Sequence, residues 1–162
     1  MPASARPTSG RARQALFDLL RGEAEDARVL DLYAGSGAVG LEAVSRGAAS
    51  AVLVEADARE LVRTLARWGI AGDEVRVLAE TAARAITRLC AEGARFDLVF
   101  ADPPYSHEPH GAELARVRGL LEEDALLVLQ ADAGAPAPAI PGLVWRSSRA
   151  YGRNVFHFFG IL

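Results

Sequence analysis

A short run of residues, DPPY at positions 102–105, combines residue types that could do chemistry on an amine. The carboxylate of Asp102 and the main-chain carbonyl of Pro103 are acceptors that could take the two N–H bonds of an exocyclic amine. Acceptors placed in this way aim the nitrogen lone pair and stabilise the positive charge that develops on alkylation. The prolines stiffen the turn, and the ring of Tyr105 offers an extruded base a stacking surface. The alternative is an ordinary strand-ending turn, with Tyr105 covering the edge of the core.

A glycine-rich loop lies upstream, in LDLYAGSGAVGLEA, between an apolar run and a helical pattern. Gly35, Gly37 and Gly40 permit a tight turn and a close approach of a ligand to the backbone. The spacing alone fits nicotinamide, flavin and other nucleotide ligands. The loop therefore predicts a nucleotide-type ligand without identifying it.

Acidic residues near this loop narrow the choice of ligand. Glu55 ends the next apolar run, about twenty residues further on, where an acid accepts hydrogen bonds from the ribose of either NAD or S-adenosylmethionine. A negative charge at Asp31 would repel a pyrophosphate but attract the cationic amino-acid end of S-adenosylmethionine. We therefore expect S-adenosylmethionine, and not a ligand with a pyrophosphate, at this loop. Glu80 follows the third apolar run and either contacts the adenine edge or faces water.

The elements that must hold these residues alternate along the chain. Short apolar runs typical of strands covered on both faces lie at 28–33, 51–55, 75–78, 96–101 and 125–130. Helical patterns lie between them, the last at 112–123, and beyond a proline-rich loop two β-rich runs flank Gly152. The order predicts an α/β fold: a Rossmann-like, mostly parallel sheet with helices on both faces and an antiparallel hairpin at the end. In such a sheet DPPY faces the glycine loop.

Length and composition limit the class of protein. A chain of 162 residues predicts a single domain over 1–162, with a capped helix segment at 1–22. No apolar run approaches the roughly 20 residues that span a bilayer. The first ten residues lack the apolar core of a secretory signal, and Cys90, the single cysteine, cannot form an intrachain disulfide, so a cytoplasmic protein is expected.

Several other side chains receive structural interpretations. His107 and His110, with Glu108 between them, lack the ligand count of a metal site, and methyl transfer needs no metal, so none is expected. Cys90 is expected in the core. Trp68 and Trp145 are expected to pack.

The motifs together carry a family resemblance. DPPY with LDLYAGSGAVGLEAVSRGA resembles amino-directed S-adenosylmethionine methyltransferases. The segment RPTSGRARQALFDLL at 6–20 is similar to the R-P-T-x-x-R-V-R-E-A-L-F motif of the RsmD family of 16S ribosomal RNA guanine-N2 methyltransferases, and AYGRNVFHFF extends the similarity toward the end of the chain. The resemblance implies a seven-stranded methyltransferase sheet, S-adenosylmethionine as donor, and the N2 amine of a guanine in small-subunit RNA as acceptor.

The resemblance also implies roles position by position. Cofactor contacts fall on Asp31, Gly35, Gly37, Glu55 and Glu80, chemistry on Asp102, Pro103 and Tyr105, and substrate contacts on Arg6, Thr8, Arg11 and Tyr105. The alternative for the arginines and Thr8 is a capped, solvated helix. The implied partner is ribosomal RNA or the assembling small subunit, bound by a monomer. Family members usually carry a basic, glycine-containing segment before R-P-T, whereas only residues 1–5 precede Arg6 in this sequence. Either a partner or an assembling ribosomal particle is therefore expected to present the substrate.

Two rival functions stay open at this point. A DNA methyltransferase acting on adenine or cytosine amines would use the same acid, prolines and aromatic ring, although so short a chain has no room for a separate target-recognition domain. A module that binds S-adenosylmethionine or a dinucleotide without catalysis would need the glycine loop but not Asp102 or Tyr105.

Overall fold

The computed structural model describes residues 10–70, 72–104 and 111–161. Its elements follow the alternation that the sequence predicts. They are α1 (Gly10–Leu20), β1 (Arg28–Asp31), α2 (Ala38–Ser45), β2 (Ser50–Val54), α3 (Arg59–Arg67), β3 (Val75–Leu78), α4 (Ala82–Ala91), β4 (Phe96–Ala101), α5 (Gly111–Ala115), the 3-10 helix η1 (Arg116–Leu120), β5 (Leu121–Asp132), β6 (Leu143–Tyr151) and β7 (Asn154–Ile161).

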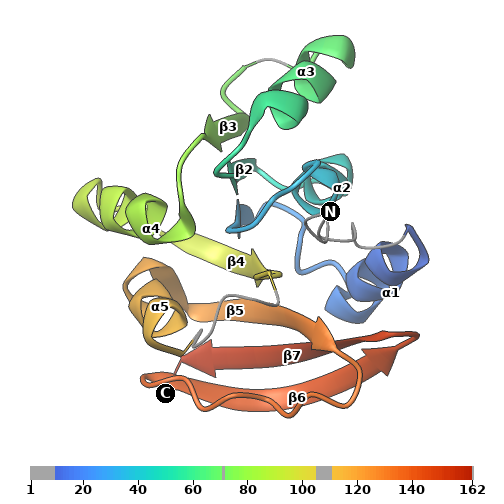
Figure 1. Ribbon diagram of the computed structural model, residues 1–162, viewed down its shortest axis with the longest axis vertical. Helices are drawn as coiled ribbons and strands as arrows, with labels where there is room; N and C mark the ends of the chain where they lie inside the picture. Colours follow the sequence, from blue (N-terminus) through green and yellow to red (C-terminus); the bar gives the residue numbers. More distant parts are fainter. Residues whose placement is uncertain (1–9, 71, 105–110, 162) are drawn as a thin grey trace.

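The strands form one seven-stranded sheet in the order β3-β2-β1-β4-β5-β7-β6. The first five pair in parallel, whereas β7 runs antiparallel to both β5 and β6 (Figure 1). After β3 the chain returns past β1 to form β4, so the strand order reverses between β1 and β4. This arrangement confirms the Rossmann-like sheet and its C-terminal hairpin, and it places the topological switch point beside the end of β1.

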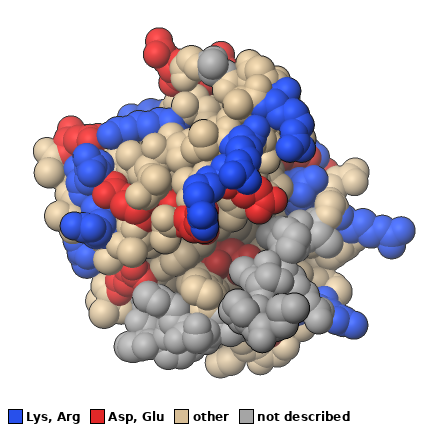
Figure 2. Space-filling view, turned by 45° about the horizontal axis from the view of Figure 1, so that its top comes forward, with Lys and Arg blue, Asp and Glu red and all other residues tan. Residues whose placement is uncertain are grey.

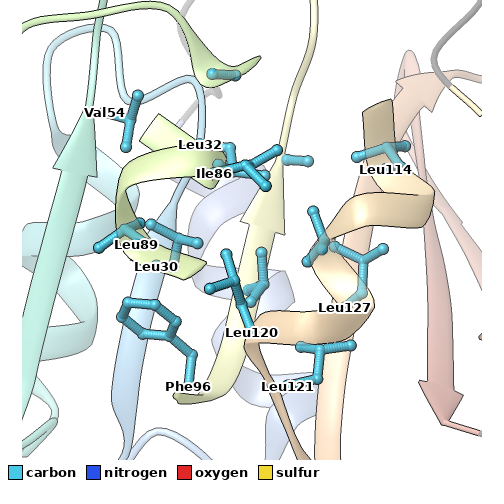
Figure 3. Close-up of a cluster of buried hydrophobic side chains, with 14 of the residues drawn as sticks. Leu30, Leu32, Val54, Ile86, Leu89, Phe96, Leu114, Leu120, Leu121 and Leu127 are labelled. Carbon is cyan, nitrogen blue, oxygen red and sulfur yellow. The ribbon is translucent and has the colours of Figure 1, made fainter. Parts of the chain in front are cut away.

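Helices cover both faces of the sheet, which explains why the strands are continuously apolar. On one face, α4, α5 and η1 pack against the strands, and Ile86, Leu114 and Leu120 interlock there with Leu30, Phe96 and other strand residues (Figure 3). On the other face, α1, α2 and α3 bury the side chains that alternate with these, among them Val29, Phe100 and Val128. The parallel strands are therefore packed against helices on both faces of the sheet.

Local sequence explains how α4 begins, but the helix expected at 112–123 is wrong beyond its first turns. The Thr81 side chain accepts a hydrogen bond of 3.3 Å from the backbone N–H of Arg84 and so caps α4. By contrast, α5 ends at Ala115, and Leu121 already pairs with Phe96 of β4. The residues whose apolar spacing predicts a helix instead form the 3-10 helix η1 and the start of the long strand β5. Pairing with β4 outweighs their helical propensity.

Three side chains expected to be packed are exposed. Trp68, directly after α3, is 63% exposed, and Trp145, on β6, is 53% exposed. The indole N–H of Trp145 donates to Ser148 Oγ at 2.9 Å. Cys90 lies on the outward side of α4 and is also exposed. The expectation that these side chains pack is therefore wrong. On α4 the buried face is made by Ala85, Ile86 and Leu89 instead of Cys90.

Strand β6 forms one edge of the sheet and departs from regular pairing. Its register with β7 shifts between Trp145 and Ser147, which makes a bulge at Arg146. The guanidinium of Arg146 turns back over β7 and donates to the Ile161 carbonyl at 3.3 Å.

None of the helices in the described ranges has the length and apolarity to cross a bilayer.

Candidate active site

A cavity of about 540 Å³ opens at the carboxyl edge of the parallel strands. Its wall is built from the ends of β1 and β4, from the segments that follow β1 to β4, including the first residues of α2 and α4, and from α5. Of the residues singled out in the sequence, the wall includes Asp31, Gly35, Glu55, Glu80 and Asp102. The switch point between β1 and β4 thus brings together side chains that lie as far as 71 positions apart in the sequence.

The glycine loop leads from β1 into α2 and forms one side of the cavity. Gly35, with φ 56°, donates its backbone N–H to Glu55 Oε2 at 3.2 Å. Gly37, with φ 85°, lies outside the cavity wall, and a Cβ there would approach Leu61 Cδ1 to 2.5 Å. Gly35 is therefore placed to face a ligand, whereas Gly37 lets α3 pack closely against the loop.

Asp31 is an acid enclosed by protein at the end of β1. It is 1% exposed, and its Oδ1 atom has no hydrogen-bond partner among the residues that the structure describes. Burial, followed by the charge of Asp102, raises the pKa of Asp31 to about 7, and hydrogen bonds from the backbone of Tyr33 and Gly40 offset this in part. A buried acceptor without a partner, beside a cavity, is suited to receive a cationic group of a ligand.

Asp102 follows β4 and contributes to the same wall. It is partly exposed, and burial, followed by the charge of Asp132, raises its pKa to about 7. Pro103 is half-buried outside the wall, whereas Pro104 forms part of it. Tyr105 lies outside the described residues. Asp102 and Pro104 thus stand on the same cavity wall as Asp31 and Gly35.

Glu80 lies on the cavity wall just before α4. Its carboxylate forms an ion pair with Arg88, with Oε1 at 2.7 Å from Nε and Oε2 at 3.2 Å from the terminal nitrogen. This pairing lowers the pKa of Glu80 below its ordinary value. A ligand edge that approaches Glu80 meets a carboxylate already held in place by α4.

Sequence reasoning missed several residues of the cavity wall, among them Tyr33 and Glu113. The Tyr33 hydroxyl donates to Glu113 Oε2 at 2.8 Å, which links the end of β1 to α5. Burial, together with the hydrogen bond to Glu113, raises the pKa of the Tyr33 phenol. Tyr33 lies two positions after Asp31, so its place beside the loop was visible in the sequence, whereas nothing in the helical pattern around Glu113 marked that residue.

The remaining predicted residues are only partly placed. Arg11 lies exposed in the first turn of α1, and Arg6 and Thr8 lie outside the described residues, as do His107, Glu108 and His110. Within the described ranges, no group of three His, Cys, Asp or Glu side chains could hold a metal ion. In Figure 2, arginine side chains are interspersed with acidic ones across the face shown. This face therefore carries no continuous positive patch, in keeping with the net charge of −3.

Comparisons with known proteins agree with this geometry. A family described as "Conserved hypothetical protein 95" matches residues 1–160. Ribosomal RNA small subunit methyltransferase D of Escherichia coli is 35% identical over 141 residues, which cover 84% of this chain and 69% of that protein. A solved structure of a conserved hypothetical protein from Streptococcus pyogenes is 35% identical, with a TM-score of 0.81, and the match covers 93% of this chain and 95% of that one. A methyltransferase structure described as complexed with SAH shares the fold at 12% identity, with a TM-score of 0.74 over 91% of this chain and 48% of that one.

Proposed function

Because this chain belongs to the conserved hypothetical protein 95 family, which includes the RsmD methyltransferases that its motifs resemble, we propose that it methylates the N2 amine of a guanine in small-subunit ribosomal RNA, with S-adenosylmethionine as donor. The E. coli relative is named for an activity on small-subunit ribosomal RNA. The choice of guanine as the base, and of N2 as the methylated atom, is based on the resemblance of the motifs to the RsmD family. The observation that carries the proposal is that Asp102 lies on the same cavity wall as the glycine loop and Asp31.

The residues of the cavity fit S-adenosylmethionine. The unpartnered Oδ1 of Asp31 suits the ammonium of the methionine portion, and Glu55 stands where ribose hydroxyls would donate hydrogen bonds. Glu80, the third acid on the wall, contacts the edge of the adenine ring in this proposal. When bound, S-adenosylmethionine supplies an electrophilic methyl group on a sulfonium.

Asp102 acts on the nucleophile. Its carboxylate accepts one N–H of the guanine amine, and the carbonyl of Pro103 accepts the other, so that the lone pair is aimed at the methyl carbon. As the new N–C bond forms and the S–C bond breaks, positive charge develops on nitrogen and the nearby carboxylate stabilises it. The methylated nitrogen then loses one proton, and Asp102, with a pKa near 7, is a suitable acceptor at neutral pH.

The substrate has further contacts in this proposal. The ring of Tyr105 stacks on the extruded base, and Arg6, Thr8 and Arg11 contact the RNA. A monomeric enzyme of the bacterial cytoplasm would meet the small subunit during its assembly. None of these contacts requires a metal ion.

The test uses the purified protein and S-adenosylmethionine labelled in its methyl group. Three acceptors are offered separately: naked small-subunit RNA, small subunits from a strain that lacks the gene, and plain DNA. After digestion, the labelled nucleoside is identified. N2-methylguanosine from either RNA sample is the expected result.

The other outcomes discriminate among the alternatives. Label in an adenine or cytosine of the DNA would move the function to DNA modification. If the protein binds S-adenosylmethionine but labels none of the three samples, the function would instead be that of a non-catalytic binding module. Label only in the assembled subunits would agree with the expectation that a particle presents the substrate.

A further inference from the structure

Asp132, the last residue of β5, lies beside the candidate catalytic acid on the neighbouring strand. The register of β4 with β5 pairs Ala101 with Leu129, and continuing it sets Asp102 level with Gln130. Asp132 is two positions beyond Gln130. The two carboxylates therefore occupy diagonal positions on adjacent strands, which lie about 4.8 Å apart.

Both side chains leave the sheet on the same face. Phe100 and Val128 belong to the core cluster that packs under α1, and side chains alternate along a strand. Counting by two from Phe100 gives Asp102, and counting by two from Val128 gives Gln130 and then Asp132. The charge of Asp132 reaches Asp102, since it is the second cause, after burial, of the raised pKa of Asp102.

Each of the five parallel strands has an acid as its last residue or within two positions after it. The order of these acids along the edge of the sheet separates a cofactor side from the opposite side. In sheet order the row is Glu80, Glu55, Asp31, Asp102 and Asp132. The first three lie on the cofactor side of Asp102 in the proposed function, and only Asp132 lies on the other side. Asp132 is exposed and lies on the strand next to Asp102, so a carboxylate stands on the side of Asp102 that is away from the proposed cofactor contacts.

The chemistry of the bases tells what a second carboxylate would select. In guanine the N2 amine is next to N1–H, a donor. In adenine the N6 amine is next to N1, and in cytosine the N4 amine is next to N3, and both of these ring nitrogens are acceptors. An ionised carboxylate only accepts hydrogen bonds, so it binds the guanine edge and repels the lone pair of the other two.

We propose that Asp132 selects guanine, by accepting a hydrogen bond from N1–H of the base whose N2 amine is held by Asp102. This inference rests on the proposed function and deepens it, since it names the residue that reads the base. Asp102 alone would take an amine from any of the three bases. Asp132 supplies the discrimination that the DPPY motif lacks.

The test compares two bases that share the N2 amine. Small-subunit RNA is joined from two pieces, so that the methylated position carries either guanosine or 2-aminopurine, whose N1 is an acceptor. It is offered in the form, naked or assembled, that the wild-type protein methylates. The variants are Asp132→Asn, whose amide can donate to N1, and Asp124→Asn as the matched control, an exposed residue near the other end of β5.

The readout is the ratio of kcat/KM on guanosine to kcat/KM on 2-aminopurine, in which the fraction of folded enzyme cancels. We expect the wild-type protein and Asp124→Asn to favour guanosine by on the order of 100-fold or more. Asp132→Asn should lose at least about 10-fold on guanosine and shift the ratio at least about 10-fold toward 2-aminopurine.

An unchanged ratio in Asp132→Asn, whether both rates stay or fall together, would overturn the role of Asp132 and leave the proposed function intact. A wild-type protein that labels no guanine in any small-subunit sample would instead overturn the proposed function, and the inference with it.

Discussion

The backbone N–H of Gly35 donates a hydrogen bond to Oε2 of Glu55 across 20 positions of the chain. The bond joins the loop after β1 to the end of β2 at the rim of the cavity. Glu55 therefore has two tasks in the proposed site: it holds the glycine loop in place, and it presents a carboxylate toward a ribose.

We expect Glu55→Gln to weaken S-adenosylmethionine binding by about 1–2 kcal/mol, roughly 5–30-fold in Kd, because hydrogen bonds to a charged acceptor are stronger than those to an amide. Isothermal titration calorimetry measures the change. Glu60→Gln, an exposed residue in the first turn of α3, is the control and should bind as the parent does. Parent-like affinity in Glu55→Gln would remove Glu55 from the ribose site.

Asp102→Asn should lower kcat by on the order of 100-fold or more, because an amide replaces the carboxylate that stabilises the developing positive charge. Cofactor affinity should change little, since the proposed cofactor contacts come from β1, β2 and β3. Single-turnover methylation measures the rate, with Asp73→Asn, an exposed loop residue, as control. A rate within a few-fold of the parent would exclude the proposed role.

The pH dependence of kcat/KM should follow the ionisation of Asp102. Its pKa of about 7 means that the acceptor form is lost as pH falls, so kcat/KM should decline about tenfold per pH unit below 7 and level off above it. Asp132→Asn removes the neighbouring like charge and should shift this limb to lower pH. Initial rates between pH 5.5 and 9 test both points, and a flat profile would contradict them.

Asp31→Asn should stabilise the free protein at neutral pH. The pKa of Asp31 rises from its ordinary value of 3.8 to about 7 on folding, so the folded state binds more protons than the unfolded state between these values. The contribution of Asp31 to stability is therefore present in full below about pH 4 and is lost as pH rises through 7.

The neutral amide avoids this loss, and we expect Asp31→Asn to gain about 1–3 kcal/mol over the wild type at pH 8, with little difference at pH 4. Urea unfolding at the two pH values measures it. Binding of S-adenosylmethionine should weaken in the same variant, because the carboxylate that suits its ammonium is gone. Equal stability differences at both pH values would argue against a buried, charged Asp31 at neutral pH.

Gly40→Ala should destabilise the fold by about 1–3 kcal/mol, because the new Cβ would collide with Cδ2 of the fully buried Leu53. The gain in helix propensity is only about 1 kcal/mol. In a Leu53→Ala background the same change should be neutral or stabilising, since the colliding methyl is absent. A double-mutant cycle by urea unfolding checks this, and additive effects would contradict a collision.

The sheet was predictable because its strands carry their own signal. Each of the strands from β1 to β4 is a compact apolar run followed by a helical pattern, and the sequence order alone then implies where the carboxyl ends meet. The sequence alone therefore places the acids Asp31, Glu55 and Asp102 at one edge of the sheet, and all three lie on the cavity wall.

What could not be predicted depended on pairing and packing between distant segments. The start of β5 at Leu121 is decided by Phe96, 25 residues earlier, against a helical pattern. The link from Tyr33 to Glu113 depends on where α5 docks. The position of Gly37, buried outside the cavity wall, depends on the close packing of Leu61 from α3. Trp68 and Trp145 were expected to pack, but both are exposed, because burial at a helix end and on an edge strand is decided by the surrounding elements and not by residue type.

The bulge at Arg146 bears on how copies of this protein behave at high concentration. An exposed edge strand offers unpaired N–H and C=O groups to which a strand of another molecule could add. In β6 the register shift breaks the regular spacing of those groups, and the exposed Arg146 and Arg149 bring like charges to any second β6 that approaches. The same strand that completes the sheet is thereby a poor template for intermolecular aggregation.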